Sequence, residues 1–85
     1  KMAVHYRGRL TDGTEFDSSY KRGYPVAMTP SGIIPGFRMA LLNMVEGDTW
    51  EIVIPPELAY GSSGAGQMIG PNQTLVFDIE LLEIK

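Results

Sequence analysis

The longest apolar pattern in the chain is a period-two series of apolar side chains across positions 74–84, whose other face turns apolar only at Leu82 and Ile84. Leu75, Phe77 and Ile79 fall on alternate positions, and Leu81 continues the series. Alternation with a period of two is typical of a β-strand that buries one face. Positions 2–10 and 49–54 repeat the pattern, so several strands present an apolar face that another element must cover.

Only one segment has a convincing helical pattern. Phe37, Ala40, Leu41 and Met44 are spaced at i, i+3, i+4 and i+7 and form one apolar stripe. Pro35 favours the first helical turn, and Gly47 is expected to end the helix. A helix of about ten residues is marginal alone, so it must pack on the sheet. The sequence therefore predicts an α+β domain in which a bent antiparallel β-sheet wraps around one short α-helix.

The remaining segments are expected to be turns, loops and two short strands. Asp12-Gly13 is a turn signal, and a return strand should follow at 14–17 with Phe16 facing inward. The polar stretch 18–25 and the glycine-rich stretch 61–71 are predicted to be loops, and 29–32 a turn. Positions 26–28 are a candidate for a short strand.

Composition excludes several classes of function. The 85 residues suit one domain or part of one, with a net charge of −3 and scattered basic residues, which argues against nucleic-acid binding. No apolar run approaches the ~20 residues of a membrane span. The absence of cysteine excludes disulfides and thiolate chemistry. The compartment stays unassigned.

Catalytic and cofactor motifs are also absent from the pattern. The stretch 61–66 resembles a phosphate loop only in its glycine content, because it lacks the Lys-Ser/Thr ending. The acidic residues are dispersed, which does not suit a metal site. His5, the only histidine, is predicted to point outward as a plain surface residue, with no buried acid behind it. We expect neither a metal nor a cofactor.

Asp17 allows two interpretations of equal weight. It follows Phe16 and should therefore leave the opposite face of the strand, beside Lys21 and Arg22. It is then either a surface ion pair worth less than about 1 kcal/mol or a carboxylate at the rim of a pocket, held by Arg22.

The segment 53–61 predicts a binding pocket. An apolar strand ends in Pro55-Pro56, and Tyr60 is then held on a tight turn by Gly61. This arrangement places an aromatic hydroxyl at the rim of an apolar space. It offers no nucleophile, so a reaction there must need no acid, base or covalent step.

Motifs along nearly the whole chain resemble those of a known family. The stretches 4–8, 12–19, 33–37, 55–61 and 74–81 are similar to those of the FKBP-type peptidyl-prolyl cis–trans isomerases, the tacrolimus-binding immunophilins. The stretches 47–51 and 69–72 lean toward the macrophage-infectivity-potentiator branch. The resemblance implies the same bent sheet around one helix. The family's leading strand is not found, so we expect residues 1–85 to be an N-terminally incomplete domain.

The resemblance also implies a set of site residues and an activity. It implies rotation about Xaa-Pro bonds in proline-containing polypeptides, a rotamase and chaperone role in protein folding, and binding of tacrolimus- or rapamycin-type macrolides. The Ile34 amide would bind a substrate carbonyl. The catalytic positions would be Tyr6, Asp17, Phe37, Tyr60 and Phe77, and the substrate-binding positions Phe16, Arg22, Val26, Ile33, Ile34, Met68 and Ile69.

Three positions depart from the common family pattern. Phe37 stands where Trp is usual, Val26 where an aromatic residue is frequent, and 65–67 replaces a more typical loop tip. Macrolide binding is therefore expected to be weak. Phe37 and the incomplete domain also favour an alternative function, a catalytically weak FKBP-like binding or docking module in a larger assembly.

Overall fold

The fold is an antiparallel sheet of five strands with one helix across its face. The computed structural model describes residues 1–66 and 69–84. The sheet follows the order β2-β1-β5-β4, and β3 pairs with β1 beside it. The strands are β1 (Met2–Leu10), β2 (Glu15–Ser18), β3 (Val26–Met28), β4 (Thr49–Ile54) and β5 (Leu75–Ile84).

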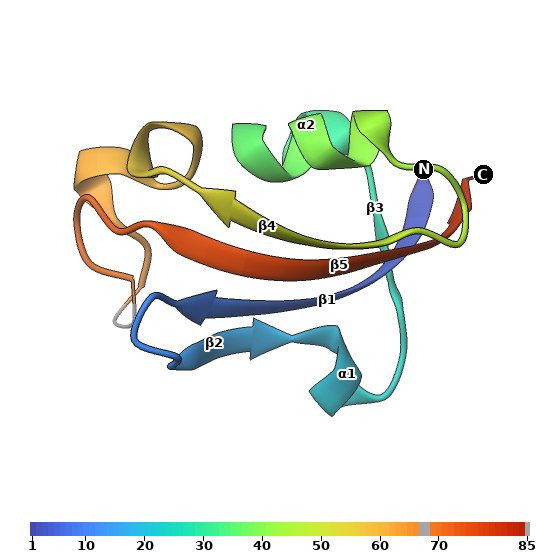
Figure 1. Ribbon diagram of the computed structural model, residues 1–85, viewed down its shortest axis with the longest axis horizontal. Coiled ribbons are helices and arrows are strands. Elements are labelled where there is room, and N and C mark those ends of the chain that lie inside the picture. Colours follow the sequence, from blue (N-terminus) through green and yellow to red (C-terminus); the bar gives the residue numbers. More distant parts are fainter. Residues whose placement is uncertain (67–68, 85) are drawn as a thin grey trace.

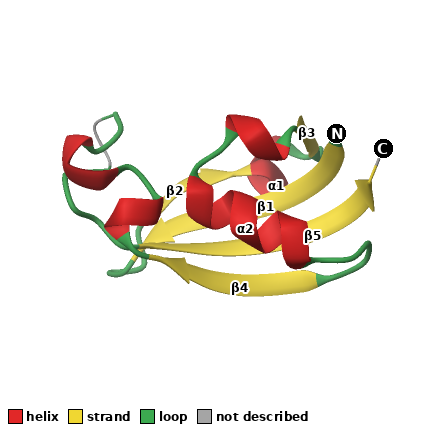
Figure 2. Cartoon of the chain, turned by 90° about the horizontal axis from the view of Figure 1, so that it is seen from above, coloured by secondary structure: helices red, strands yellow, loops and turns green. Residues whose placement is uncertain are grey.

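The helix α2 (Pro35–Asn43) covers one face of the sheet, as Figures 1 and 2 show. Its apolar stripe is buried as predicted, and Leu41 is fully enclosed. The alternation in β5 is also confirmed, because its four inward residues are at most 4% exposed. The buried apolar cluster consists of Val4, Phe37, Ala40, Leu41, Met44, Ile54, Ile69, Leu75, Phe77, Ile79 and Leu81.

The prediction that Gly47 ends this helix is wrong. The helix ends at Asn43, where the backbone of Met44 turns extended and its N–H donates to the Leu41 carbonyl at 3.3 Å. Gly47, with φ +93°, instead forms part of the turn that leads into β4. Its N–H donates to the Leu81 carbonyl at 2.8 Å, so it ties this turn to β5.

The stretch 18–25, predicted to be a loop, contains a one-turn helix, α1 (Ser19–Arg22). The Oγ of Ser18 caps it by accepting from the Lys21 N–H, and Gly23 ends it with φ +85°. A turn this short has no apolar periodicity, so only its two caps could have revealed it. In the part of the chain that the structure describes, three 3₁₀ turns complete the fold, at Pro30–Gly32, Pro56–Leu58 and Gly61–Ser63.

A β-bulge interrupts the regular pairing of β1 with β2. Gly8 pairs with Asp17 and Arg9 pairs with Glu15, so Phe16 is an extra residue in β2. An extra residue disturbs the alternation of side chains on its strand. The prediction that Phe16 and Asp17 leave opposite faces is therefore wrong, because both line the same cavity.

Candidate functional site

A cavity of about 390 Å³ lies between the N-terminal end of α2 and the sheet. It draws on segments far apart in the sequence, since β1, β2, β5, α2 and the turn at Tyr60 all contribute. The lining residues are Tyr6, Phe16, Asp17, Met28, Gly32, Ile33, Ile34, Phe37, Tyr60 and Phe77.

Four aromatic rings form the inner walls of this cavity. Phe37 and Phe77 meet edge to face with centroids 5.2 Å apart, and Phe16 meets Phe77 in the same way at 5.6 Å. Tyr6 contacts Phe37 edge to face at 5.9 Å. Edge-to-face pairs are the favoured geometry of aromatic contacts, so the rings hold one another in place. The result is an apolar box whose shape is set by packing.

One wall of the cavity is polar. The hydroxyl of Tyr6 donates to Oδ2 of Asp17 at 2.6 Å, and Nη1 of Arg22 donates to Oδ1 at 2.7 Å. Nη2 of Arg22 also donates to the Tyr6 hydroxyl at 3.1 Å, which closes a ring of three side chains. The Ser18 N–H donates to the same carboxylate at 2.8 Å. Asp17 is therefore tied into the cavity wall and is more than a surface ion pair.

The polar wall shifts the pKa of the Asp17 carboxyl and the pKa of the Tyr6 hydroxyl further from neutral pH. Burial acts to raise the pKa of Asp17, but hydrogen bonds from Tyr6 and Arg22 and the charge of Arg22 outweigh it, so the pKa lies below the ordinary 3.8. Burial, followed by the hydrogen bond to Asp17, raises the pKa of Tyr6 above 10.0. Asp17 is thus an anion and Tyr6 a neutral donor across the physiological range.

Tyr60 and the N-terminal end of α2 both border the cavity. Tyr60 is 38% exposed at the mouth of the cavity. Ile34 is the N-cap residue of α2, and Pro35 follows it, so no side chain caps this end of the helix. The N-terminal turn of a helix leaves backbone N–H groups without intrahelical acceptors, and it carries a partial positive charge. A carbonyl oxygen could be accepted here.

Some predicted site residues lie elsewhere. Val26 lies on β3, where it pairs with Val4 of β1, and it is not among the lining residues. Met28, on the same strand as Val26, does line the cavity. Period two places both on one side of β3, so the sequence alone could not choose between them. Ile69 is buried in the core, 7% exposed, instead of lining the cavity. Arg22 is not among the lining residues but donates to Asp17 and Tyr6, and Met68 lies outside the described residues.

Comparison with known proteins identifies the family. The family described as FKBP-type peptidyl-prolyl cis-trans isomerase matches residues 1–82. This chain belongs to that family. An FKBP-type 22 kDa peptidyl-prolyl cis-trans isomerase of Escherichia coli is 55% identical over 84 residues, which are 99% of this chain and 41% of the relative. The peptidyl-prolyl cis-trans isomerase Mip of Coxiella burnetii is 48% identical over 85 residues, 100% of this chain and 37% of the relative.

A solved structure confirms the FKBP-like fold. The crystal structure of FkpA from Escherichia coli superposes with a TM-score of 0.93 at 51% identity, over 99% of this chain and 39% of that chain. The predicted family, including its likeness to macrophage infectivity potentiators, is thus confirmed. The chain spans only 37–41% of the length of these three relatives.

The opposite face of this FKBP-type sheet carries a second depression, which at about 700 Å³ is larger than the apolar cavity. Five of its nine lining residues are charged, and each of these five is already in an ion pair, such as Arg7 with Asp78 at 2.8 Å and Lys21 with Glu15 at 2.9 Å. A surface whose charges satisfy one another offers little to a ligand. The apolar cavity is therefore the better candidate site.

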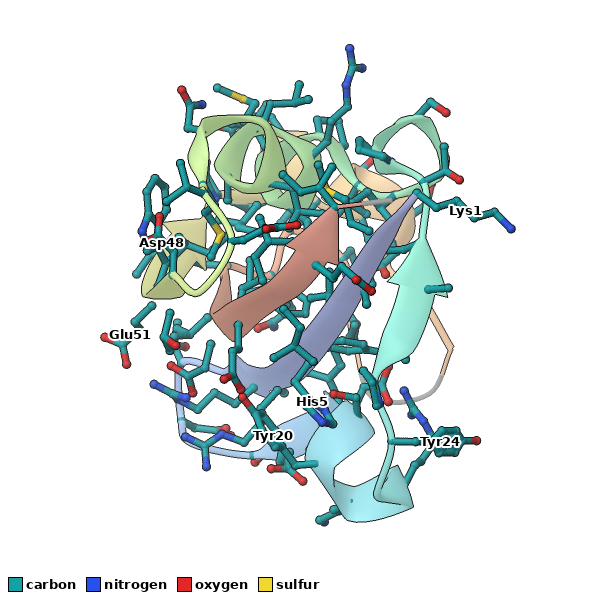
Figure 3. All side chains as sticks on the ribbon, turned by 90° about the vertical axis from the view of Figure 1, so that its right-hand side faces the viewer. Lys1, His5, Tyr20, Tyr24, Asp48 and Glu51 are labelled. Carbon is teal, nitrogen blue, oxygen red and sulfur yellow. The ribbon has the colours of Figure 1, made fainter. Side chains whose placement is uncertain are left out.

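His5 is not the plain surface residue that the sequence predicts. It lies on the side of the sheet away from α2, with Tyr20 beside it (Figure 3), and the two rings stack at 4.5 Å. Its Nδ1 is 2.8 Å from Oγ of the fully buried Ser19, which also accepts from the Tyr6 N–H at 2.7 Å. His5 thus helps to fasten α1 to β1.

Two further observations concern metals and membranes. No group of three or more His, Cys, Asp or Glu side chains that could hold a metal occurs among residues 1–66 and 69–84. Within the same part of the chain, no helix is long and apolar enough to cross a membrane.

Proposed function

We propose that the protein is a peptidyl-prolyl cis–trans isomerase that acts on Xaa-Pro bonds in polypeptides. The observation that carries this proposal is the apolar cavity walled by edge-to-face rings, with a single ionised carboxylate held in place by Tyr6 and Arg22. The names of the relatives support it, because the relatives of Escherichia coli and Coxiella burnetii are peptidyl-prolyl isomerases.

Such a cavity suits a reaction whose barrier is rotation and not bond cleavage. Resonance in the amide gives the C–N bond double-bond character and a rotational barrier of about 18–20 kcal/mol. The planar amide is more charge-separated and better hydrated than the twisted amide. A pocket that removes water therefore disfavours the planar form relative to the twisted form. No proton needs to leave the substrate, which fits a site with neither an acid nor a base poised near neutral pH.

In the proposed mechanism, each part of the site has a role. The proline ring enters the aromatic box and rests on Phe37 as its floor, with Phe16 and Phe77 as walls. The carbonyl that precedes proline accepts from the Ile34 amide at the start of α2, and the Tyr60 hydroxyl donates to a substrate carbonyl at the rim. Holding one side of the amide while the other turns lowers the barrier if the twisted geometry is bound more tightly.

The walls also define the substrate class. Ile33 and Ile34 are apolar neighbours of the site of rotation, so a large apolar Xaa is favoured. The same box accepts the proline-like ring of tacrolimus- and rapamycin-type macrolides. Acceleration of Xaa-Pro isomerisation gives the protein a role in assisting protein folding, where this step takes tens to hundreds of seconds without catalysis.

Exchange spectroscopy on a tetrapeptide with a Leu-Pro bond tests the proposal. The protein at micromolar concentration should raise the cis–trans exchange rate far above the uncatalysed rate, and a Glu-Pro peptide should be turned over more slowly. Exchange at the uncatalysed rate, with peptide binding retained, would instead support the docking module. Absence of both binding and catalysis would refute both functions.

A further inference from the structure

Gly8 lies inside β1, two residues before its end, and is buried. Its φ is outside the left-handed region, so the backbone there does not require glycine. Glycine inside a strand weakens the strand, because it has more freedom to lose and no side chain to pack. A reason for glycine at this position must therefore come from its surroundings.

The surroundings leave no room for a side chain. A Cβ atom added at Gly8 would lie 2.6 Å from Cζ and 2.8 Å from Cε1 of Phe16, and 2.8 Å from Cε1 of Phe77. Carbon atoms in contact prefer separations of about 3.5–4.0 Å. Two of the rings that wall the cavity thus rest directly on the backbone of Gly8.

The β-bulge brings the first of these rings over Gly8. Because Gly8 pairs with Asp17 and Arg9 pairs with Glu15, the extra residue Phe16 turns to the same side of the sheet as Asp17. The second ring comes from the other side, because Phe77 is the partner of Gly8 across the β1–β5 ladder. The two rings then meet edge to face at 5.6 Å above a strand position that has no side chain.

We propose that Gly8 is a positioning residue that sets the width of the proline-binding box. By admitting both rings down to the backbone, it holds Phe16 and Phe77 back from the centre of the cavity. A methyl group at position 8 would push one or both rings by roughly 1 Å toward the space that the proline ring needs. This inference rests on the proposed isomerase function, and it adds a residue that touches no substrate.

The first test is Gly8→Ala, with Val4→Ala as a matched control. Val4 is fully buried on the same strand and does not line the cavity, so its truncation lowers stability without moving a ring into the box. Gly8→Ala should lower kcat/KM for a Leu-Pro tetrapeptide about tenfold or more, because misplacement by about 1 Å can cost up to roughly 10²-fold. Val4→Ala, assayed well below its unfolding temperature, should stay within about twofold of wild type.

A second pair of variants separates crowding from general damage. Leucine lacks the two ring atoms of Phe16 that a Cβ at position 8 would meet, and the space they leave also lets the Phe77 ring shift. In a Phe16→Leu background, adding Gly8→Ala should therefore change kcat/KM by less than about twofold. The same loss in both backgrounds would overturn the proposal, as would near-wild-type activity of Gly8→Ala. If Gly8→Ala alone does not fold, recovery of folding by Phe16→Leu supports the crowding.

NMR measurements test the packing role of Gly8 even if the wild-type protein lacks isomerase activity. The ring-proton NMR shifts of Phe16 and Phe77 should change in Gly8→Ala, and the introduced methyl group should show NOEs to both rings. Unchanged ring shifts would overturn the role of Gly8. An inactive wild type with displaced rings in Gly8→Ala would overturn only the isomerase function and leave the packing role of Gly8 in place.

Discussion

The hydrogen-bond network around the Asp17 carboxylate joins side chains from three different elements. Tyr6 comes from β1, Arg22 from α1 and Asp17 itself from β2. Its side chain is 41% exposed, yet it accepts from Tyr6, Arg22 and the Ser18 N–H. At the scale of single residues, the polar wall of the cavity is thus a small network whose members orient one another.

Asp17→Asn should lower turnover more than stability. The amide keeps the shape of the side chain but loses the charge that Arg22 and the Tyr6 hydroxyl meet, so the wall is no longer held in one arrangement. We expect kcat/KM to fall about tenfold, with a stability loss near neutral pH of about 1 kcal/mol or less. Asp12→Asn is the control, because Asp12 accepts from Thr14 and does not line the cavity. Equal turnover in the two variants would contradict a role for Asp17.

The stability that Asp17 contributes should depend on pH. Its pKa in the folded protein lies below the ordinary 3.8, so the contribution is fully present well above pH 3.8 and is lost as the pH falls through the folded value. The difference in free energy of unfolding between wild type and Asp17→Asn should therefore shrink between about pH 6 and pH 3. Urea unfolding at both pH values measures this difference. A gap that widens toward acid pH would show that the sign is wrong.

Phe37→Trp should tighten the binding of tacrolimus. Phe37 is 4% exposed, lines the cavity and is its proposed floor, so a larger ring would add apolar contact with the ligand. A few tens of Å² at about 25 cal/mol per Å² is worth about 1 kcal/mol, roughly a fivefold gain in affinity. Calorimetric titration of both proteins measures the change. Equal or weaker binding would mean that Phe37 is not the floor of the ligand site.

Among the elements, α2 is held by packing on the sheet and not by its own propensity. It has nine residues and no side-chain cap at its N-terminal end, and helices of this length are marginal alone. Because α2 presents Ile34 and Phe37 to the cavity, its docking on the sheet also sets the geometry of the site.

Leu41→Ala should lower the free energy of unfolding by about 2–5 kcal/mol, because Leu41 is fully buried between α2 and the sheet. Leu42→Ala is the matched control. This neighbour on the same helix is 59% exposed and should cost less than about 1 kcal/mol. Chemical denaturation of both variants tests the difference. Similar losses in both would mean that the helix packs on the sheet through another face.

For the whole molecule, the distribution of titratable groups predicts a flat pH profile of catalysis. In the polar wall, the pKa of Asp17 is shifted below 3.8 and that of Tyr6 above 10.0, so neither changes charge near neutrality. The second-order rate constant for a Leu-Pro peptide should therefore vary by less than about twofold between pH 6 and pH 8. A bell-shaped profile centred in that interval would contradict a mechanism without acid–base catalysis.

Local patterns in the sequence were enough to predict most elements of the sheet and the helix. The alternation in β5 and the apolar stripe of α2 are each visible in a short window of the sequence, because burial of one face imposes the period of the element. The segment 53–61, which predicts the pocket around Tyr60, is also a short stretch of consecutive residues. The family and the class of the site could therefore be predicted from sequence.

The features that only the tertiary structure decided depend on contacts between distant segments of the chain. The bulge opposite Gly8 places Phe16 and Asp17 in one cavity, although strand parity predicts opposite faces. The contact of His5 with Ser19 and the rings that rest on Gly8 likewise join positions far apart along the chain. A period describes one strand at a time, whereas register, bulges and close approach are properties of two strands packed together.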